Sequence, residues 1–531
     1  MVRIGQTAIV AALSTLGACG GGGGSDASLS TGGQQGSSSS GWRPGVFLPA
    51  DSFAAQCVAP RTGIDPSNGL PFPDIQSDSL AENNWLRSWS DDLYLWYDEV
   101  TDSDPVGIAT LEYFDLLKTP QVTPSGNDKD RFHFTIPTDE WQSLSQSGIS
   151  AGYGAEWVVI SATPPREVVV AFTQPESPAT MLVAPLARGT TVIEIDGVDL
   201  INATDQLSVD TINAGLFPAS VGETHEFTIR DAGSSTLRTV EMQSVNVNLA
   251  PVQNVSVIET LSGSVGYMLF NEHIATAEQA LIDAITELSD ANVNDLVLDI
   301  RYNGGGFLIL AGELAYMIAG VAPTVGQVFE DIEFNDKHPV TNPVTLQPLA
   351  PLPFPTTSQG LSAAFGQALP TLDLPRVIVL TGPNTCSASE SIINSLRGVD
   401  VEVIQIGATT CGKPYGFFPA DNCGTTYFSI QFRGINAKGF GDYTDGFSPV
   451  NTVGSVGTVT PGCSVGDDFS HALGDPLEGR LAAALQYREN QSCPAPSGLA
   501  IPGLSKTAVP LSASDGLMHR SPLRENRLLD W

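Results

Sequence analysis

The fold of the C-terminal half follows from one stretch, DLVLDIRYNGGG at residues 295–306. The apolar run between Asp295 and Ile300 predicts a buried strand. The glycines after it predict a loop whose backbone N–H groups can converge on an anion. Because functional loops of layered α/β folds leave the carboxyl ends of strands, this loop is a candidate part of a site.

Strands and helices alternate on both sides of this stretch, with strands expected at 265–270, 376–380, 401–406 and 425–435, and helices at 277–288, 308–318 and 388–396. Such alternation predicts an α/β core of layered sheet and helices with partly parallel strands, over residues 249–492. The Pro-rich segment 321–375 is predicted to be an irregular insertion over one face.

The N-terminal half differs in character. Apolar residues, including Trp85, Trp89 and Trp96, recur at three- and four-residue steps and predict an amphipathic helix between Ser77 and Val100. A second short helix at 110–118 completes an expected helical cap over residues 43–140. Short β-rich runs punctuated by Gly and Pro then predict a small β-domain over residues 141–248.

Composition excludes several classes of function. The 531 residues contain 24 Lys and Arg against 58 Asp and Glu, a net charge of −34. So acidic a chain repels phosphate backbones, and no basic patch stands out, so we expect no nucleic-acid partner. The six His are scattered and no Cys-x-x-Cys occurs, so neither a metal nor a nucleotide cofactor is expected.

The start of the sequence predicts export. Residues 1–18 carry Arg3, a short apolar stretch and Leu16-Gly17-Ala18 before Cys19, a pattern typical of a signal peptide. Leu-Gly-Ala-Cys also resembles the lipobox of bacterial lipoproteins, which implies cleavage before Cys19 and its lipidation. A Gly- and Ser-rich tether over residues 19–42 would join the lipid to the folded part. We therefore expect a membrane-anchored lipoprotein that faces the periplasm or the cell exterior, with a flexible tail at 493–531.

Seven cysteines are present, and six remain for disulfides if Cys19 is lipidated. Six cysteines permit fifteen connectivities. Proximity in the sequence favours two pairs, Cys411 with Cys423 and Cys463 with Cys493. Cys57 and Cys386 would then be paired with each other or free.

Two further loops carry residues suited to nucleophilic catalysis. Ser387 precedes the helix expected at 388–396, where a helix dipole and free N–H groups, including that of Ala388, favour negative charge. One strand later, a loop presents Lys413. Burial in an apolar site lowers the pKa of a lysine, and a neutral amine can take the proton of a serine hydroxyl. Neither loop contains a His, so the residues favour a Ser-Lys pair.

The order of these motifs resembles the S41 family of serine peptidases, the C-terminal processing or tail-specific proteases. The motifs are Asn303-Gly304-Gly305-Gly306, Ser387-Ala388-Ser389-Glu390 and Gly412-Lys413. The resemblance implies a ClpP/crotonase-like core that hydrolyses protein or peptide substrates. It implies Ser387 as nucleophile, Lys413 as general base, and the N–H groups of Gly305 and Ala388 as the oxyanion hole. Apart from the resemblance, the Ser-x-x-Glu pattern predicts that Ser389 and Glu390 cap the helix. His273 could line the cleft, but a structural role is the favoured prediction.

The β-rich segment resembles a PDZ domain. The resemblance rests on the run Ser150 to Gly154, on Ser177-Pro178-Ala179, and on residues 189–198. It implies that the loop Gly152-Tyr153-Gly154 offers backbone N–H groups to the terminal carboxylate of a peptide while the peptide adds a strand to the sheet. The alternative is a spacer of the same shape without a ligand.

Three positions depart from the S41 pattern. Phe417 stands where relatives often carry a Gln that orients the lysine, Pro414 replaces a Gly, and Cys386 replaces a small residue. Two other functions therefore stay open. The chain could be a non-catalytic peptide-binding lipoprotein, or it could hydrolyse non-peptide esters with the same nucleophile.

Overall fold

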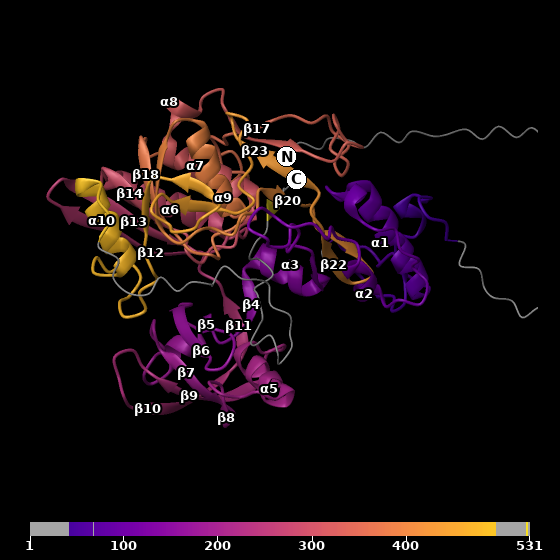
Figure 1. The fold of residues 1–531 in the computed structure, drawn as a ribbon, viewed down its shortest axis with the longest axis horizontal. Helices are drawn as coiled ribbons and strands as arrows, with labels where there is room; N and C mark the ends of the chain where they lie inside the picture. Colours follow the sequence, from indigo (N-terminus) through magenta and orange to yellow (C-terminus); the bar gives the residue numbers. More distant parts are fainter. Residues whose placement is uncertain (1–41, 67, 495–526, 529–531) are drawn as a thin grey trace, which may run out of the picture. The chain divides into compact units, whose positions relative to one another are not determined.

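A six-stranded sheet forms the centre of the C-terminal half (Figure 1). The computed structural model describes residues 42–66, 68–494 and 527–528. The strand order is β12, β13, β14, β18, β19, β26, in which β12 is antiparallel to β13 and the other neighbours are parallel. The strands span Val252–Thr260, Gly263–Phe270, Asp295–Asp299, Arg376–Thr381, Glu402–Gly407 and Gly462–Ser464. The predicted α/β core is therefore confirmed.

Helices cover both faces of this sheet because its central strands are apolar on both sides. In β14, Leu296 and Leu298 pack into the core that contains α6, α7 and α9, whereas Val297 packs into the opposite core with Leu481 of α10. Figure 1 shows α10 on the other side of the sheet from α7 and α9. The helices span Ala277–Asp290 (α6), Leu308–Ala319 (α7), Ala388–Gly398 (α9) and Gly479–Asn490 (α10).

The parallel register brings three loops to one edge of the sheet. Asp299 at the end of β14 pairs with Leu380 of β18, and Thr381 pairs with Gly407 at the end of β19. The chain therefore leaves all three strands at the same level. The glycine loop, the Ser387 turn and the Lys413 loop are the segments that follow.

A second sheet belongs to the β-rich domain, and all its pairings are antiparallel. Its order is β10, β9, β7, β6, β5, with β8 beside β7. It packs with α5 around its own core, which includes Trp157, Val192, Ile212 and Phe227. The elements span Ala155–Ser161 (β5), Glu167–Thr173 (β6), Pro178–Met181 (α4), Thr191–Ile195 (β7), Val198–Asp199 (β8), Gln206–Leu216 (α5), Thr224–Arg230 (β9) and Leu237–Gln243 (β10).

The N-terminal part contains the expected helices, but the first is shorter than predicted. Helix α1 spans Ser79–Leu93 and ends because Tyr94 is extended and the Leu95 N–H donates to Ile430 O (2.8 Å). Trp85 and Trp89 stack at 5.4 Å between ring centroids within a small aromatic core. The other elements span Ala50–Ser52 (η1), Gln56–Cys57 (β1), Ile75–Gln76 (β2), Tyr97–Glu99 (η2), Thr110–Asp115 (α2), Phe134–Pro137 (β3), Thr138–Ser147 (α3), Ile149–Gly152 (β4) and Val245–Asn248 (β11).

Two sequence expectations change in the remaining segments. The segment 321–375 is not irregular throughout, because β16 (Val328–Glu333) pairs with β23 (Phe432–Ile435). The single strand expected at 425–435 is two strands, β22 (Thr425–Phe428) and β23, in different sheets. Pairing between segments far apart in the sequence determines both the strand in 321–375 and the division of 425–435.

The other elements span Gly306–Phe307 (β15), Val321–Thr324 (α8), Leu352–Pro353 (β17), Tyr415–Gly416 (β20), Ala420–Asn422 (β21), Phe447–Pro449 (β24), Thr458–Thr460 (β25) and Arg527–Leu528 (β27).

The expected signal peptide, Cys19 and almost all of the tether lie outside the described residues. Among the residues that are described, no helix has the length and apolar character needed to cross a bilayer.

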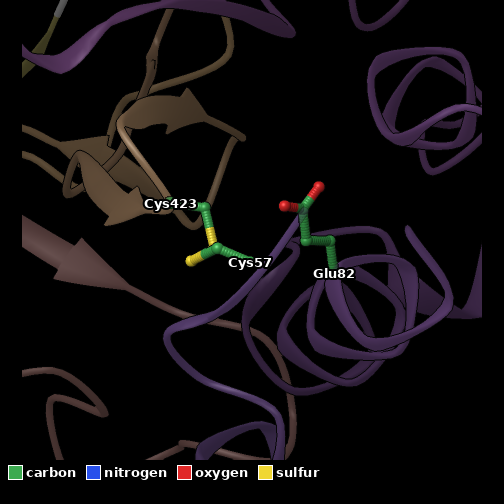
Figure 2. A group of neighbouring side chains, drawn as sticks. All are labelled: Cys57, Glu82 and Cys423. Carbon is green, nitrogen blue, oxygen red and sulfur yellow. A yellow bond between two sulfur atoms is a disulfide. The ribbon is translucent and has the colours of Figure 1, made fainter. Parts of the chain in front are cut away.

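Three disulfides are present among the described residues: Cys57–Cys423, Cys386–Cys411 and Cys463–Cys493. The last pair is the one that sequence spacing predicts. The predicted Cys411–Cys423 pair is wrong, because the sheet order places the loop after β19 beside the loop after β18 and so brings Cys411 to Cys386. Figure 2 shows the Cys57–Cys423 disulfide near Glu82 of α1.

Peptide mapping under non-reducing conditions tests these pairs. We expect cross-linked peptides that join Cys386 to Cys411 and Cys57 to Cys423, and none that joins Cys411 to Cys423. Recovery of a Cys411–Cys423 peptide from folded protein would contradict the described geometry.

Candidate active site

Ser387 lies on a sharp turn between β18 and α9. Its backbone has φ +58° and ψ −117°, a combination that costs a non-glycine residue free energy and occurs mainly at functional sites. The turn is held from below, because Thr385 Oγ1 donates to Ile300 O (2.8 Å) and the Cys386 N–H donates to Asn303 O (3.2 Å). The Ser387 hydroxyl is buried and has no hydrogen-bond partner among the described residues.

Ala388 is the first residue of α9, so its N–H has no acceptor within the helix. The helix dipole adds positive potential at this end. Ala388 is fully buried beside Ser387, and a negative oxygen at this position would be stabilised in a low-dielectric setting.

The glycine loop is organised by the side chain of Asn303. Its Oδ1 accepts from the Gly305 N–H (2.9 Å) and from His273 Nδ1 (2.9 Å), and its Nδ2 donates to Phe270 O (3.0 Å). The N–H of Gly305, expected to face an oxyanion, is therefore engaged within the loop. Gly306 must be a glycine, because φ is +138° and a Cβ atom would lie 2.3 Å from His273 O.

His273 is buried against this loop. Burial lowers the pKa of His273 to about 3, although its hydrogen bond to Asn303 opposes the shift, so the ring is neutral. The ring orients Asn303, and this contact fits the structural role that the sequence suggests for His273.

Glu390 joins the Ser387 turn to the Lys413 loop. Its carboxylate accepts from the N–H groups of Ser387 (3.0 Å), Gly412 (2.8 Å) and Lys413 (2.8 Å), and from Thr410 Oγ1. The side chain is fully buried. Burial raises the pKa of Glu390, while these hydrogen bonds favour the ionised form. The sequence predicts a helix cap, which accounts only for the contact with the Ser387 N–H. The other three contacts bind the loop that carries Lys413.

Lys413 is fully buried in an aromatic setting. Its Nζ lies 4.7 Å from the centroid of the Phe132 ring and 4.3 Å from that of Phe417. Phe417 therefore contributes a ring face to the lysine. Because Ser387 Oγ has no partner in the described part of the chain, no direct hydrogen bond joins Ser387 Oγ to Lys413 Nζ there.

A buried charge network supports the glycine loop from the opposite face of the sheet, and no sequence pattern revealed it. Arg301 is fully buried and contacts Asp299 (2.9 Å), Asp467 (2.7 Å) and Glu478 (2.7 Å). From the β-rich domain, Arg188 reaches Asp467 (2.6 Å) and Tyr302 Oη (2.7 Å). Breaking a buried ion pair costs about 3–5 kcal/mol, so the loop depends on these contacts.

The arginines also determine the charge of Asp467. Burial alone would raise its pKa, but Arg480, Arg301 and Arg188 outweigh this effect and hold the pKa well below its usual range. Asp467 therefore stays ionised. The one signal in the sequence was a charged residue, Arg301, directly after a buried strand.

The loop Gly152-Tyr153-Gly154 lies in the β-rich domain and directly precedes β5. Tyr153 is buried in that domain's own core. Its carbonyl accepts from the Ala179 N–H (2.9 Å), and a Cβ atom at Gly154 would lie 2.2 Å from Ser177 Cβ. The loop is thus packed tightly against the start of α4.

The backbone of Arg527–Leu528 forms β27 and pairs in parallel with β15, with Gly306 opposite Arg527 and Phe307 opposite Leu528. These two residues belong to the segment expected to be a flexible tail. Their pairing shows that the edge of the glycine loop accepts an extended strand.

The segment that carries these loops is similar to known proteins. Residues 264–417 match the family model of peptidase family S41, a range that contains the glycine loop, Ser387 and Lys413. Over 293 residues the chain is 28% identical to a carboxyl-terminal-processing protease of Picosynechococcus sp., covering 54% of this chain and 60% of the relative. The chain therefore matches less than two thirds of that relative's length.

A solved structure shows the same fold. It is a protein of Bacteroides fragilis assigned as a candidate S41 protease, with a TM-score of 0.52 and 22% identity over 79% of this chain and 100% of that chain. Residues 264–417, with the strands and loops that carry Ser387 and Lys413, are thus similar to peptidase family S41.

Proposed function

We propose that this chain is a serine endopeptidase that uses Ser387 as nucleophile and Lys413 as general base. One observation carries the proposal: the N–H groups of Ser387 and Lys413 donate to the same oxygen, Oε2 of Glu390. The two residues are 26 positions apart in the sequence, yet one carboxylate holds both backbones. The match to peptidase family S41 supports the same assignment.

In the proposed reaction, Ser387 Oγ attacks the carbonyl carbon of a peptide bond while the neutral amine of Lys413 takes the hydroxyl proton. The C–N bond then breaks, and Lys413 returns the proton to the leaving amine. Water hydrolyses the acyl-enzyme by the reverse sequence of proton transfers. The hydroxyl's lack of a partner in the described residues leaves it available for attack.

Negative charge on the substrate oxygen would be stabilised by the N–H of Ala388 at the start of α9. For Gly305 we propose a conditional role, because its N–H now donates to Asn303 Oδ1. The substrate oxygen would have to compete with the Asn303 side chain for the Gly305 N–H.

Ester substrates could use the same nucleophile and N–H donors. A panel of peptide and ester substrates distinguishes a peptidase from an esterase.

We propose that the substrate binds as an extended strand. The parallel pairing of β27 with β15 supports this mode, because backbone groups of Gly306 and Phe307 already pair with an extended segment. The relative's description as a carboxyl-terminal-processing protease suggests cleavage near the C-terminus of a protein substrate.

The PDZ-like role of residues 141–248 is also a proposal. Strand β5 lies at the end of its sheet, so one edge can accept an added peptide strand. The loop Gly152-Tyr153-Gly154 directly precedes β5, where N–H groups could meet a terminal carboxylate.

Export and lipidation at Cys19 complete the proposal. Three disulfides among the described residues support an oxidising compartment, such as the periplasm or the cell exterior. Mass spectrometry of the membrane fraction would detect the lipidated Cys19.

Digestion of an unfolded model protein tests the pair directly. We compare the soluble form lacking residues 1–42 with its Ser387→Ala and Lys413→Ala variants. Loss of either the nucleophile or the base should reduce cleavage by at least about a thousandfold. Circular dichroism checks that the variants are folded. Equal cleavage by parent and variants would contradict the assignment, and no cleavage by any of the three would favour the peptide-binding alternative.

Replacement of Glu390 tests the shared acceptor. In Glu390→Gln, an NH₂ group replaces one accepting oxygen and faces backbone N–H groups. Loss of a buried hydrogen bond to a charged group costs about 1.5–3 kcal/mol, so we expect kcat to fall by about ten- to a hundredfold. Because burial raises the pKa of Glu390, activity of the parent should also decline as acid protonates this carboxylate, at a higher pH than for a solvated Glu.

The matched control is Glu82→Gln. Glu82 is also buried, and its carboxylate accepts from the Val58 N–H (2.8 Å) and from Thr110 Oγ1 (2.6 Å), beside the Cys57–Cys423 disulfide (Figure 2). This variant should lose stability but keep kcat. Equal kcat losses in both variants would assign the effect of Glu390 to folding alone.

A further inference from the structure

The Cys386–Cys411 disulfide lies between the two proposed catalytic residues. Cys386 directly precedes Ser387, and Cys411 is two residues before Lys413. We propose that this disulfide positions the Lys413 loop against the Ser387 turn, so that turnover depends on its oxidation state. This inference rests on the proposed function, and it assigns a role to two residues that do not react with substrate.

Backbone contacts show that the disulfide is part of a continuous clamp. The Cys411 N–H donates to Thr385 O (3.0 Å), and the Thr410 N–H donates to Phe447 O (3.0 Å). Arg131 Nη2 donates to Cys411 O from the N-terminal part of the chain. The disulfide is the covalent member of a set of contacts that otherwise consists of hydrogen bonds.

The clamp acts at the base of a long side chain. Lys413 carries its amine on four methylene groups, so a small shift of the loop backbone moves the amine relative to Ser387 Oγ. A misplacement of about 1 Å can cost about a hundredfold in rate. Glu390 holds the N–H groups of Gly412 and Lys413, and the disulfide fixes the preceding residue. Phe417 offers the lysine a ring face but no polar group.

A dithiol can reduce this disulfide by thiol–disulfide exchange. Cys386 is fully buried, whereas Cys411 is partly exposed, so a thiolate of the dithiol would attack the Cys411 sulfur and release Cys386. The second thiol of the reagent then displaces Cys411 from the mixed disulfide. Two electrons and two protons pass to the protein, which gains two thiols, and the reagent becomes a cyclic disulfide.

The chain offers a matched control. The Cys463–Cys493 disulfide closes a segment with a sequence separation of 30, against 25 for Cys386–Cys411. In the chain-entropy description, loops of such similar length stabilise a fold by similar amounts. Cys463 is in β26 and Cys493 follows α10, so this pair lies outside the loops that carry Ser387 and Lys413.

The experiment compares the parent with the double variants Cys386→Ala/Cys411→Ala and Cys463→Ala/Cys493→Ala. For the first we expect kcat to fall by about ten- to a hundredfold with KM within about twofold, because positioning and not substrate contact is lost. The control variant should keep its kcat. Dithiothreitol should lower kcat of the parent to a similar extent, reversibly on reoxidation, and should not lower it further in Cys386→Ala/Cys411→Ala.

Hydrogen exchange gives a second readout that does not need activity. In the Ser387→Ala background, loss of the disulfide should speed exchange at the Gly412 and Lys413 N–H groups, and loss of the control disulfide should not. Unchanged kcat in Cys386→Ala/Cys411→Ala, or unchanged exchange at these two amides, would overturn the inference. If the parent cleaves no substrate, the proposed function fails, and the exchange rates alone decide whether the disulfide holds this loop.

Discussion

A buried carboxylate with backbone N–H donors from two segments is the contact on which this site depends. Glu390 accepts from the Ser387 N–H on its own helix and from Gly412 and Lys413 on the next loop. Burial without these donors would carry a large desolvation cost, since an isolated carboxylate loses its hydration. If the loop after β19 moved away, the carboxylate would lose the Gly412 and Lys413 donors and keep only the Ser387 N–H. This constraint ties the position of the lysine to that of the serine.

The sheet makes this contact geometrically available. Three neighbouring parallel strands end at one level, so the glycine loop, the Ser387 turn and the Lys413 loop meet at one edge. Asn303 connects the first two, because its carbonyl accepts from Ser389 Oγ (3.0 Å) and from the Cys386 N–H. On the other face of the sheet, Arg301 holds the base of the glycine loop against Glu478 and Asp467. The strand order thus brings the three loops together, and local polar contacts hold them in place.

The sequence was sufficient to predict the strand and helix alternation and the loops that carry Ser387 and Lys413, because apolar periodicity and glycine placement are local signals. Pairing across the sheet is not local. Cys423 is closer to Cys411 in sequence, yet the order of β18 and β19 brings Cys386 to Cys411 instead. For the same reason the capture of the Gly305 N–H by Asn303, and the charge network around Arg301, needed the three-dimensional structure.

We propose above that Ser387 is a nucleophile, activated by Lys413 where Glu390 and the Cys386–Cys411 disulfide hold the two loops together. Treatment with a fluorophosphonate, followed by mass-spectrometric location of the adduct, tests it without any knowledge of the natural substrate. We expect a single adduct on Ser387. It should form faster as pH rises from about 6 to about 10 and much more slowly in Lys413→Ala, because the base must be neutral. Absence of an adduct, an adduct on another serine, or an equal rate in Lys413→Ala would contradict it.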